Sequence, residues 1–460
     1  MKHRAVRVIV GLTSAVALVV LLSIAAAGSG TAASGHRTAA GVPEAQRLEA
    51  RPAAPRVPNG KALRRKYRGQ RITFIGDAAV GKSHTRDEML VARFTRDTGI
   101  RVNLIPHPSA SGAAYAQLAR IFSSRSSSAD VMMLDVIWPG AFAPYLVNLK
   151  PTLARAARQH AQGIIQNNTV GGKLVAMPWF GDFGILYYRT DLLRKYGFRH
   201  PPRTWAELGT QARRIQNGER RTNSNFYGFV FQGNAYEGLT CNALEWLASS
   251  GGGTLIANGK ATLNNPRATN ILNTIRGWVG NITPRGVTSY QEDQALNAFD
   301  GGNAAFMRNW PYAYAASQTT DVKGKFNVTV LPHGAGGTSV GTVGGWQLGV
   351  SKYSKHKAAA IELVRYLTSP AVQRFDAIFN SNVPTIPSVA ANKAVRRTNP
   401  YLKPEISRVK RVTRPSRYLK GRYQQGSQYI YQGINQILNG QNARSVLPGI
   451  AQRLDRLLRR

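Results

Sequence analysis

Short apolar runs alternate with longer amphipathic segments between Arg71 and Pro332. The apolar runs predict strands at residues 71–76, 100–106, 130–135, 185–188, 226–231 and 326–332. A helical spacing of apolar residues predicts helices at residues 86–98, 113–124 and 205–217. The first five of these segments follow the order βαβαβ, so the pattern predicts an α/β fold with mostly parallel sheets.

The amino terminus has the layout of an export signal. Lys2, Arg4 and Arg7 precede an uncharged apolar stretch at residues 8–27, and the small-residue segment GSGTAASG follows. A stretch of about 20 apolar residues could also span a bilayer. Residues 1–35 are therefore expected to be a signal peptide or an N-terminal membrane anchor. No cysteine follows the apolar run, which excludes a lipobox.

Residues 36–66 are rich in Ala, Pro and Arg and show no periodicity, so we expect a linker there and a folded body from Tyr67 onward. The protein is expected to be extracellular, either secreted or tethered to the outer face of the cytoplasmic membrane. A basic linker would favour an anionic membrane or cell wall as a neighbour.

Composition and charge narrow the functional classes. With 460 residues, 43% of them hydrophobic, the chain can bury a large core and is expected to form two lobes. Its single cysteine, Cys241, excludes internal disulfides, a Cys-based zinc site and an iron–sulfur cluster. The apolar residues around Cys241 predict a buried helix position rather than a nucleophile.

The net charge of +39 suggests an anionic partner. Basic residues are concentrated at the two ends of the chain: residues 1–68 hold 12 Lys and Arg against 2 acidic residues, and residues 393–460 hold 16 against 2. A terminal run of this kind, such as residues 408–422, is typical of a solvated face. Nucleic acid is therefore not expected as a partner.

The segment at residues 76–83, GDAAVGKS, matches the phosphate-binding pattern GxxxxGK[ST] between a predicted strand and a predicted helix. One interpretation is a P-loop nucleotide-binding enzyme, with Lys82 reaching the terminal phosphate. The other is a glycine-rich turn at the carboxyl end of a strand, where α/β folds place their ligands. Export to a compartment poor in nucleoside triphosphates favours the turn.

Other catalytic signatures, namely HExxH, GxSxG and CxxC, do not occur in the sequence. Aromatic residues instead recur beside short polar groups in four turn-rich segments: MPWFGDFG (177–184), QGNAYEGL (232–239), RNWPYAY (308–314) and VGGWQLG (343–349). A Trp ring against the apolar face of a sugar, with polar side chains bonding its hydroxyls, is typical of carbohydrate sites. For any single Trp, core packing is the competing interpretation.

Five blocks of sequence carry a family resemblance: GGKLVAMPWFGDFGILYYRTDLLRKYGF, PPRTWAEL, FYGFVFQGNAYEGLTCN, FDGGNAAFMRNWPYAY and GGWQLGVSKYSKHKAAA. They resemble the extracellular solute-binding proteins of ABC sugar importers, and most of all trehalose/maltose-binding proteins. The resemblance runs from about residue 70 to 450. It implies a two-lobed α/β fold of the periplasmic-binding type (type II, Venus flytrap) with multiple interlobe crossovers. Lobe one would comprise 67–178 and 312–372, and lobe two 179–311 and 373–460.

Carried onto this sequence, the family's ligand-binding positions form one predicted set: Asp135, Asp182, Trp310, Tyr312, Gly345, Trp346 and Arg414, with Glu237 as a further candidate. The carboxylates would accept sugar hydroxyls, and Arg414 would donate to sugar oxygens. Asp135 is also singled out without the family, because it ends a predicted parallel strand.

The resemblance implies a receptor and not an enzyme. It would capture trehalose, maltose or a related α-glucoside in the interlobe cleft as a monomer and deliver this sugar to the transmembrane subunits of an ABC permease. No catalytic residue, cofactor or metal is expected. The alternatives are the P-loop enzyme and a polyanion-binding cell-surface protein.

Two positions depart from the trehalose/maltose pattern. Thr85 and Ala114 stand where those binders carry an acidic residue and an arginine. Unless Asp77, His84 or Arg86 compensates, we expect another α-linked disaccharide or a longer oligosaccharide as the ligand.

Overall fold

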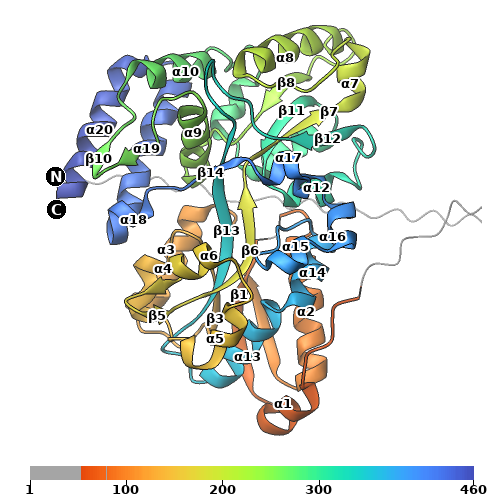
Figure 1. Ribbon diagram of the computed structural model, residues 1–460, viewed down its shortest axis with the longest axis vertical. Helices are drawn as coiled ribbons and strands as arrows, with labels where there is room; N and C mark the ends of the chain where they lie inside the picture. Colours follow the sequence, from red (N-terminus) through yellow and green to blue (C-terminus); the bar gives the residue numbers. More distant parts are fainter. Residues whose placement is uncertain (1–52, 79, 460) are drawn as a thin grey trace, which may run out of the picture. The chain divides into compact units, whose positions relative to one another are not determined.

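The computed structural model describes residues 53–78 and 80–459 (Figure 1). The predicted export signal or anchor at residues 1–35, and most of the predicted linker, lie outside this range. Within the described residues, no helix is both long enough and apolar enough to cross a membrane.

Lobe one is built on a six-stranded sheet. Its strands are β1 (Arg71–Gly76), β2 (Arg101–Pro106), β3 (Val131–Asp135), β13 (Val340–Val350) and β14 (Lys410–Val412), in the order β14-β13-β3-β1-β2, with β6 (Met177–Phe183) paired to β13. Strand β1 runs parallel to β2 and β3, whereas β13 is antiparallel to β3. Every residue of β3 is buried, as expected for a strand covered on both faces.

Helices cover this first sheet. They include α1 (Gly60–Tyr67), α2 (Ser83–Thr98), α3 (Ser111–Ser123), α5 (Lys150–Ala157) and α13 (Lys357–Leu367). Apolar residues of α2 and α13, among them Leu90, Phe94 and Leu363, pack with Phe74 of β1 in one core. Helix α2 ends at Gly99, whose φ of 72° lies in the left-handed region that a side chain disfavours.

Lobe two is built on a four-stranded sheet. Its strands are β7 (Ile185–Arg189), β8 (Tyr227–Val230), β11 (Ala304–Asn309) and β12 (Phe326–Thr329), in the order β12-β7-β11-β8. The longer helices of this lobe are α8 (Trp205–Glu219), α9 (Glu237–Ser249), α10 (Pro266–Arg276), α11 (Glu292–Asp300), α19 (Tyr423–Leu438) and α20 (Ala443–Arg459). The C-terminal helices α19 and α20 lie beside α9 and α10 (Figure 1).

Shorter elements complete the described fold. The helices are α4 (Pro139–Phe142), α6 (Gln162–Asn167), α7 (Thr190–Lys195), α12 (Tyr312–Ser317), α14 (Pro370–Phe379), α15 (Pro387–Ala390), α16 (Lys393–Thr398), α17 (Pro404–Ser407) and α18 (Ser416–Leu419). The 3₁₀ turns are η2 (Ala143–Tyr145), η3 (Arg285–Ser289), η4 (Pro400–Leu402) and η5 (Lys420–Arg422). Two small hairpins pair β4 (Thr169–Val170) with β5 (Lys173–Leu174), and β9 (Ile256–Ala257) with β10 (Lys260–Ala261).

The chain passes between the lobes several times. Gly184 alone separates β6 of the first sheet from β7 of the second. A Cβ at Gly184 would clash with the Glu245 carboxylate, so a larger residue there would have to displace the buried Glu245–Arg308 pair. A second passage leads from β12 to β13, and a third lies at residues 380–386 after α14. The long strands β6 and β13 lie side by side along this boundary (Figure 1).

Each predicted strand and helix is present in the structure, with bounds that differ by a few residues. The sheets are mixed rather than mostly parallel, because β7 is antiparallel to both β11 and β12.

The boundaries of the predicted lobes and linker also shift. Strand β12, assigned to lobe one by the sequence, pairs with β7 in lobe two, where Phe326 packs on Tyr187 and Phe299. The folded body begins before Tyr67: Val57 is buried and donates its N–H to Asp97, 2.8 Å away.

Candidate ligand-binding site

A cavity with about 870 Å³ of empty space, open solvent at its mouth included, is lined by residues of both lobes. The segments after β1 and β2 and the last residue of β3 contribute from lobe one, and the starts of α9, α11 and α12 contribute from lobe two. All eight residues of the predicted set line this cavity: Asp135, Asp182, Glu237, Trp310, Tyr312, Gly345, Trp346 and Arg414. Asp135 and Arg414, which are 279 residues apart in the chain, thus meet at one site.

Arg414 joins the two lobes at the base of the cavity. Its guanidinium donates to both Asp135 oxygens, at 3.1 and 2.6 Å, and to Glu237 Oε1 at 2.9 Å. All three side chains are buried. Burial raises the pKa of Glu237, and Arg414 opposes this shift. Asp135 and Arg414 therefore bind each other in the protein without a ligand. On Arg414, only Nε lacks a partner among the described residues.

Glu237 has no free oxygen. Besides the Arg414 bond, Oε1 accepts the Tyr423 hydroxyl, and Oε2 accepts from Ser427 Oγ at 2.6 Å. Glu237 thereby fixes the first residue of α9 to α19 and to Arg414. Glu237 therefore stabilises the structure of the site.

Asp182, on β6, is a lining carboxylate with an unsatisfied oxygen. Its Oδ1 is buried and has no hydrogen-bond partner among the described residues. Burial raises its pKa well above the usual range, and the like charges of Asp77 and Asp376 add to this, against the opposing charge of Arg308. A carboxyl group in this state can both donate and accept a hydrogen bond.

Trp310 follows β11 and is held on several sides. Its Nε1 donates to Glu292 Oε1 at 3.1 Å, its backbone N–H donates to Asn309 Oδ1 at 2.9 Å, and the guanidinium carbon of Arg308 lies 3.9 Å from its ring centroid. Tyr312, two residues on, has a buried hydroxyl without a partner among the described residues. This segment therefore combines a fixed aromatic ring with a free polar group.

Gly345 and Trp346 lie on β13 next to Asp135 of β3. Gly345 has a φ of 111°, and a Cβ there would lie 2.6 Å from the carbonyl oxygen of Phe180, so only glycine fits. The Trp346 ring stacks on His107 with centroids 5.0 Å apart and meets Trp138 edge-on at 5.7 Å. A second fixed aromatic ring thus borders the cavity.

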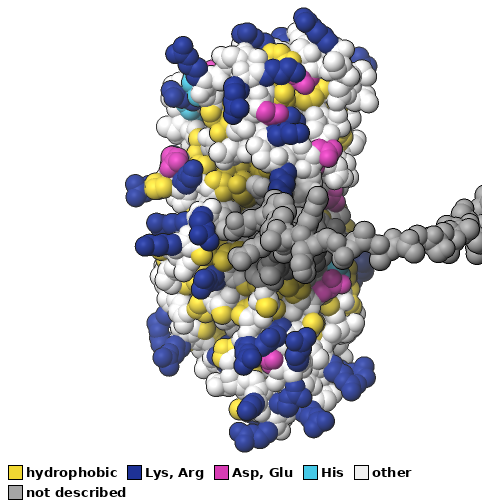
Figure 2. Space-filling model, turned by 90° about the vertical axis from the view of Figure 1, so that its right-hand side faces the viewer, with side chains coloured by type: hydrophobic (Ala, Val, Ile, Leu, Met, Phe, Trp, Pro, Cys, Tyr) yellow, Lys and Arg dark blue, Asp and Glu magenta, His cyan; other side chains and the backbone are white. Residues whose placement is uncertain are grey.

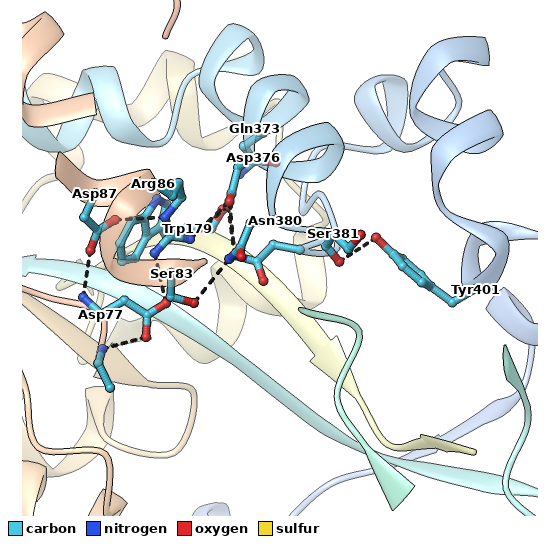
Figure 3. Close-up of polar contacts among 12 residues, drawn as sticks. Asp77, Ser83, Arg86, Asp87, Trp179, Gln373, Asp376, Asn380, Ser381 and Tyr401 are labelled. Carbon is cyan, nitrogen blue, oxygen red and sulfur yellow. Dashed lines mark hydrogen bonds and ion pairs between the residues drawn. The ribbon is translucent and has the colours of Figure 1, made fainter. Parts of the chain in front are cut away.

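Beneath the cavity, Arg86 of α2 is fully buried among three carboxylates (Figure 3). It donates to Asp77 at 2.9 Å, to Asp87 at 2.8 Å and to Asp376 at 3.1 Å. Its guanidinium carbon lies 4.2 Å from the Trp179 ring centroid. Burial raises the pKa of Asp87 to about 7 even though Arg86 opposes the shift.

Of the three residues considered as compensation for Thr85 and Ala114, Asp77 alone lines the cavity. Arg86 orients Asp77 from below, and His84 lies 3.5 Å from Glu88 on the same helix. Asp77 therefore supplies a carboxylate on the lobe-one side.

A family model described as bacterial extracellular solute-binding protein matches residues 81–374, and a "Probable ABC transporter-binding protein" of Deinococcus radiodurans is 47% identical over 328 residues, 70% of this chain and 78% of that protein. The chain belongs to the bacterial extracellular solute-binding protein family. Members of this family bind substrates and are not enzymes. An extracellular location agrees with this membership.

Solved structures agree with a two-lobed solute-binding protein. Maltose-bound MalE3 of T. maritima superposes with a TM-score of 0.80 and is 35% identical, with 85% of this chain and all of that chain covered. A solute-binding protein of Agrobacterium vitis with bound D-mannitol superposes with a TM-score of 0.72 at 19% identity, covering 85% of this chain and 99% of that one. The fold is thus the two-lobed periplasmic-binding fold predicted from the sequence.

In this solute-binding protein, four backbone N–H groups in the described residues of the GDAAVGKS loop, 76–78 and 80–83, are used within the protein and not for a phosphate. The N–H groups of Asp77, Ala78, Val80 and Ser83 donate to Asp87 Oδ2, Asp77 Oδ1, the Ala78 carbonyl and the Val80 carbonyl, respectively. These four amides are therefore already used, and the Asp135 carboxylate is bound to Arg414 rather than open to magnesium. The loop contributes Asp77, Ala78, Val80 and Ser83 to the cavity wall. The structure contradicts the P-loop interpretation.

Sequence reasoning missed several lining residues. They are His107, Ser109, Ser111, Tyr236, Gln291, Glu292, Asp293 and Asn382. Most lie in loops or at helix starts without a distinctive motif, and Glu292 and Asp293 are the acidic residues in the first turn of α11. Cys241 is buried on α9, as predicted, and burial raises the pKa of its thiol far above the usual range. Among residues 53–78 and 80–459, no cluster of three or more His, Cys, Asp or Glu could hold a metal ion.

Proposed function

We propose that this protein is the sugar receptor of an ABC importer, with maltose, trehalose or a related α-glucoside as the first candidates. The observation that carries the proposal is the pair of fixed rings, Trp310 and Trp346, that line one cavity together with carboxylates from both lobes. The 35% identity to a maltose-bound protein along the whole of that chain supports a sugar of this class.

In this proposal residues of both lobes contact the sugar. A pyranose ring lies against Trp310, and its hydroxyls bond to Asp182 and Asp77. The free Nε of Arg414 donates to a sugar oxygen. Arg414 also binds Asp135 and Glu237, so these two carboxylates do not contact the sugar in this proposal. This refines the expectation that every predicted carboxylate binds sugar hydroxyls directly.

The ligand would act by shifting a conformational population. Both lobes contact the sugar together only when they are closed, so binding favours the closed form by the difference in affinity. The connections at Gly184, between β12 and β13, and at residues 380–386 are the places where the backbone would bend. The closed monomer then presents itself to the transmembrane subunits of the permease.

A thermal-shift screen of the full chain against maltose, trehalose, monosaccharides and Mg-ATP tests the proposal. A sugar at a hundredfold over its Kd would add about 2.7 kcal/mol to the unfolding free energy. The rise should disappear in Trp310→Ala, while Lys82→Ala should keep it. No increase in the melting temperature with any sugar would contradict the proposal. An increase with Mg-ATP alone would restore the nucleotide interpretation.

A polyanion-binding surface is a second candidate, because one groove favours it. The groove between α7 and α8 is lined by Lys195, Arg213, Arg214 and Arg221, and Lys and Arg side chains are spread widely over one face of the protein (Figure 2). Salt-sensitive retention on heparin that falls in Arg213→Glu/Arg214→Glu, but not in an equal charge reversal at Arg64 and Arg65, would support it. Equal losses in both would indicate diffuse charge only.

A further inference from the structure

The cavity gathers negative charge in a strongly positive protein. Six of the chain's 22 acidic residues line it, whereas Arg414 is the one lining Lys or Arg among the described residues. The six are Asp77, Asp135, Asp182, Glu237, Glu292 and Asp293. A cleft lined by one sign of charge focuses its field on a bound ligand. The ligand therefore meets a potential opposite to that expected from the net charge of +39.

Positive charges behind the cavity wall do not neutralise its negative charge. Arg86 and Arg308 lie there, but they are accompanied by three more buried carboxylates: Asp87, Asp376 and Glu245. The carboxylates in and behind the wall thus outnumber the arginines. Protonation of the carboxyl groups whose pKa values burial raises, namely Asp87, Asp182, Glu237, Asp293 and Asp376, would reduce the excess.

Three buried oxygen atoms in one part of the cavity have no hydrogen-bond partner among the described residues. They are Asp182 Oδ1, Asp293 Oδ1 and the Tyr312 hydroxyl. The charges of Asp182, Asp293 and Glu292 all act on Tyr312, so each of these groups lies near Tyr312. Trp310 borders the same place, since a Cβ on Gly344 would lie 3.1 Å from both its ring and the Asp182 Cβ.

The chemistry of these groups matches a primary ammonium group. An ammonium has three N–H donors and no acceptor, and the face of a Trp ring attracts a cation. A sugar hydroxyl brings one donor and also needs donors from the protein. Among the charged residues of the lining, Arg414 alone is a donor, and two of the cavity's carboxylates already occupy its guanidinium.

We propose that the cavity selects a sugar bearing a protonated primary amine, with the ammonium between Asp182 and Asp293 beside Trp310, and that it rejects sugars bearing phosphate or carboxylate. This inference rests on the proposed function and names the class of its ligand. Rejection of anions follows from the same charge excess, because Arg414 is held by Asp135 and Glu237 and cannot turn to a phosphate.

Calorimetric titration of the full chain at pH 7 and low salt tests the inference. The probes are maltose and trehalose, the same sugars with an amine in place of the 2-hydroxyl or 6-hydroxyl group, their 6-phosphates, and CaCl₂ or MgCl₂ alone. At least one amino derivative should bind about tenfold more tightly than its parent. The phosphates should bind at least about tenfold more weakly.

Matched isosteric variants locate the effect. Asp182→Asn and Asp293→Asn should each reduce the preference for the amino sugar over its parent, whereas Asn at the exposed Asp321 should leave this preference unchanged. Added salt should reduce the preference as well. If Asp182→Asn does not fold, Asp293→Asn, at a half-buried position near the start of α11, still tests the site.

The outcomes separate the inference from the function on which it rests. Binding of a parent sugar without a tighter amino derivative would overturn the inference and leave the receptor proposal intact. Failure of every sugar, neutral and amino alike, would overturn both. Binding of Ca²⁺ or Mg²⁺ alone, abolished in Asp182→Asn, would overturn the inference by making the acidic site a metal site.

Discussion

Two buried arginines stack on tryptophans in or beneath the cavity wall, but their charge environments differ. Arg86 lies 4.2 Å from the Trp179 ring centroid and meets three carboxylates, whereas Arg308 lies 3.9 Å from the Trp310 ring centroid and meets one carboxylate and one amide. The partners of Arg308 are Glu245, at 2.9 and 2.7 Å, and Gln232, at 3.1 Å. One cluster is balanced in charge, and the other carries an excess of negative charge.

Each cluster also reaches a passage between the lobes. Glu245 Oε1 accepts the Thr342 N–H at 3.1 Å near the start of β13, and it leaves no room for a side chain at Gly184. The Arg86 cluster continues to the segment after α14, where Asn380 donates to Ser83 and the Tyr401 hydroxyl donates to the Ser381 carbonyl (Figure 3). The comparison suggests that the balanced pair supports a binding ring, while the unbalanced cluster orients Asp77 and responds to pH.

The largest effect is expected from removing the arginines themselves. Arg86→Met and Arg308→Met each leave buried carboxylates without their countercharge, which costs about 3–5 kcal/mol of unfolding free energy. The loss should be larger for Arg86→Met, because it strands three carboxylates instead of one. Urea unfolding at pH 7 measures both, with Met at the exposed Arg374 of α14 as a near-neutral control. A smaller loss at Arg86 than at Arg308 would refute the distinction.

Truncating the two stacked rings should separate stability from binding. Trp179 is 1% exposed and lies outside the cavity lining, so Trp179→Ala should cost about 3–5 kcal/mol of unfolding free energy. Trp310 lines the cavity, so Trp310→Ala should weaken sugar binding about a hundredfold or more. Unfolding curves and calorimetric titrations of both variants check this. If the sugar affinity of Trp310→Ala were unchanged, the assignment of the site would be wrong.

A pH-dependent effect follows from Asp87. Its folded pKa of about 7 lies above the ordinary aspartate pKa of 3.8, so the folded state keeps a proton that the unfolded chain releases between these two values. Unfolding free energy therefore falls as pH rises through this window, by at most about 1.4 kcal/mol per pH unit for one proton.

Asp87→Asn should flatten this fall, because it removes the titrating group. The measurement is the unfolding free energy between pH 4.5 and 7 for the wild type, Asp87→Asn and Asp321→Asn. An unchanged slope in Asp87→Asn would mean that Asp87 is not the group that holds the proton.

The smallest effect is expected at Lys82, four residues before Arg86 in the sequence. Lys82→Ala should change sugar affinity by less than about twofold, because Lys82 does not line the cavity. Calorimetric titration checks the affinity, and Mg-ATP should give no binding heat with either protein. A large loss of sugar affinity would show that the loop contributes more than Asp77 to the site.

Much of the fold could be predicted from local patterns. The βαβαβ order at residues 71–135 was visible because buried strands and amphipathic helices differ in their apolar spacing. The lobe to which β12 belongs could not be predicted, because its four residues have an ordinary strand pattern that does not specify the neighbouring strand. The packing of Phe326 on Tyr187 of β7 places it in lobe two. The site residues were accessible through the resemblance, whereas Glu292 and Asp293 carried no motif of their own.

By itself, the sequence determined the two-lobed class, the buried Cys241 and the set of residues at the site, because each depends on local composition or on short sequence blocks. Only the tertiary structure decided what these residues do to one another. It paired Arg414 with Asp135 and Glu237, and it placed residues of a phosphate-binding motif in the wall of the cavity. It also left Asp182 Oδ1 and the Tyr312 hydroxyl without a hydrogen-bond partner in the part of the chain that the structure describes. The physical reason is that hydrogen bonding, burial and charge balance depend on distances between segments hundreds of residues apart, which no local pattern encodes.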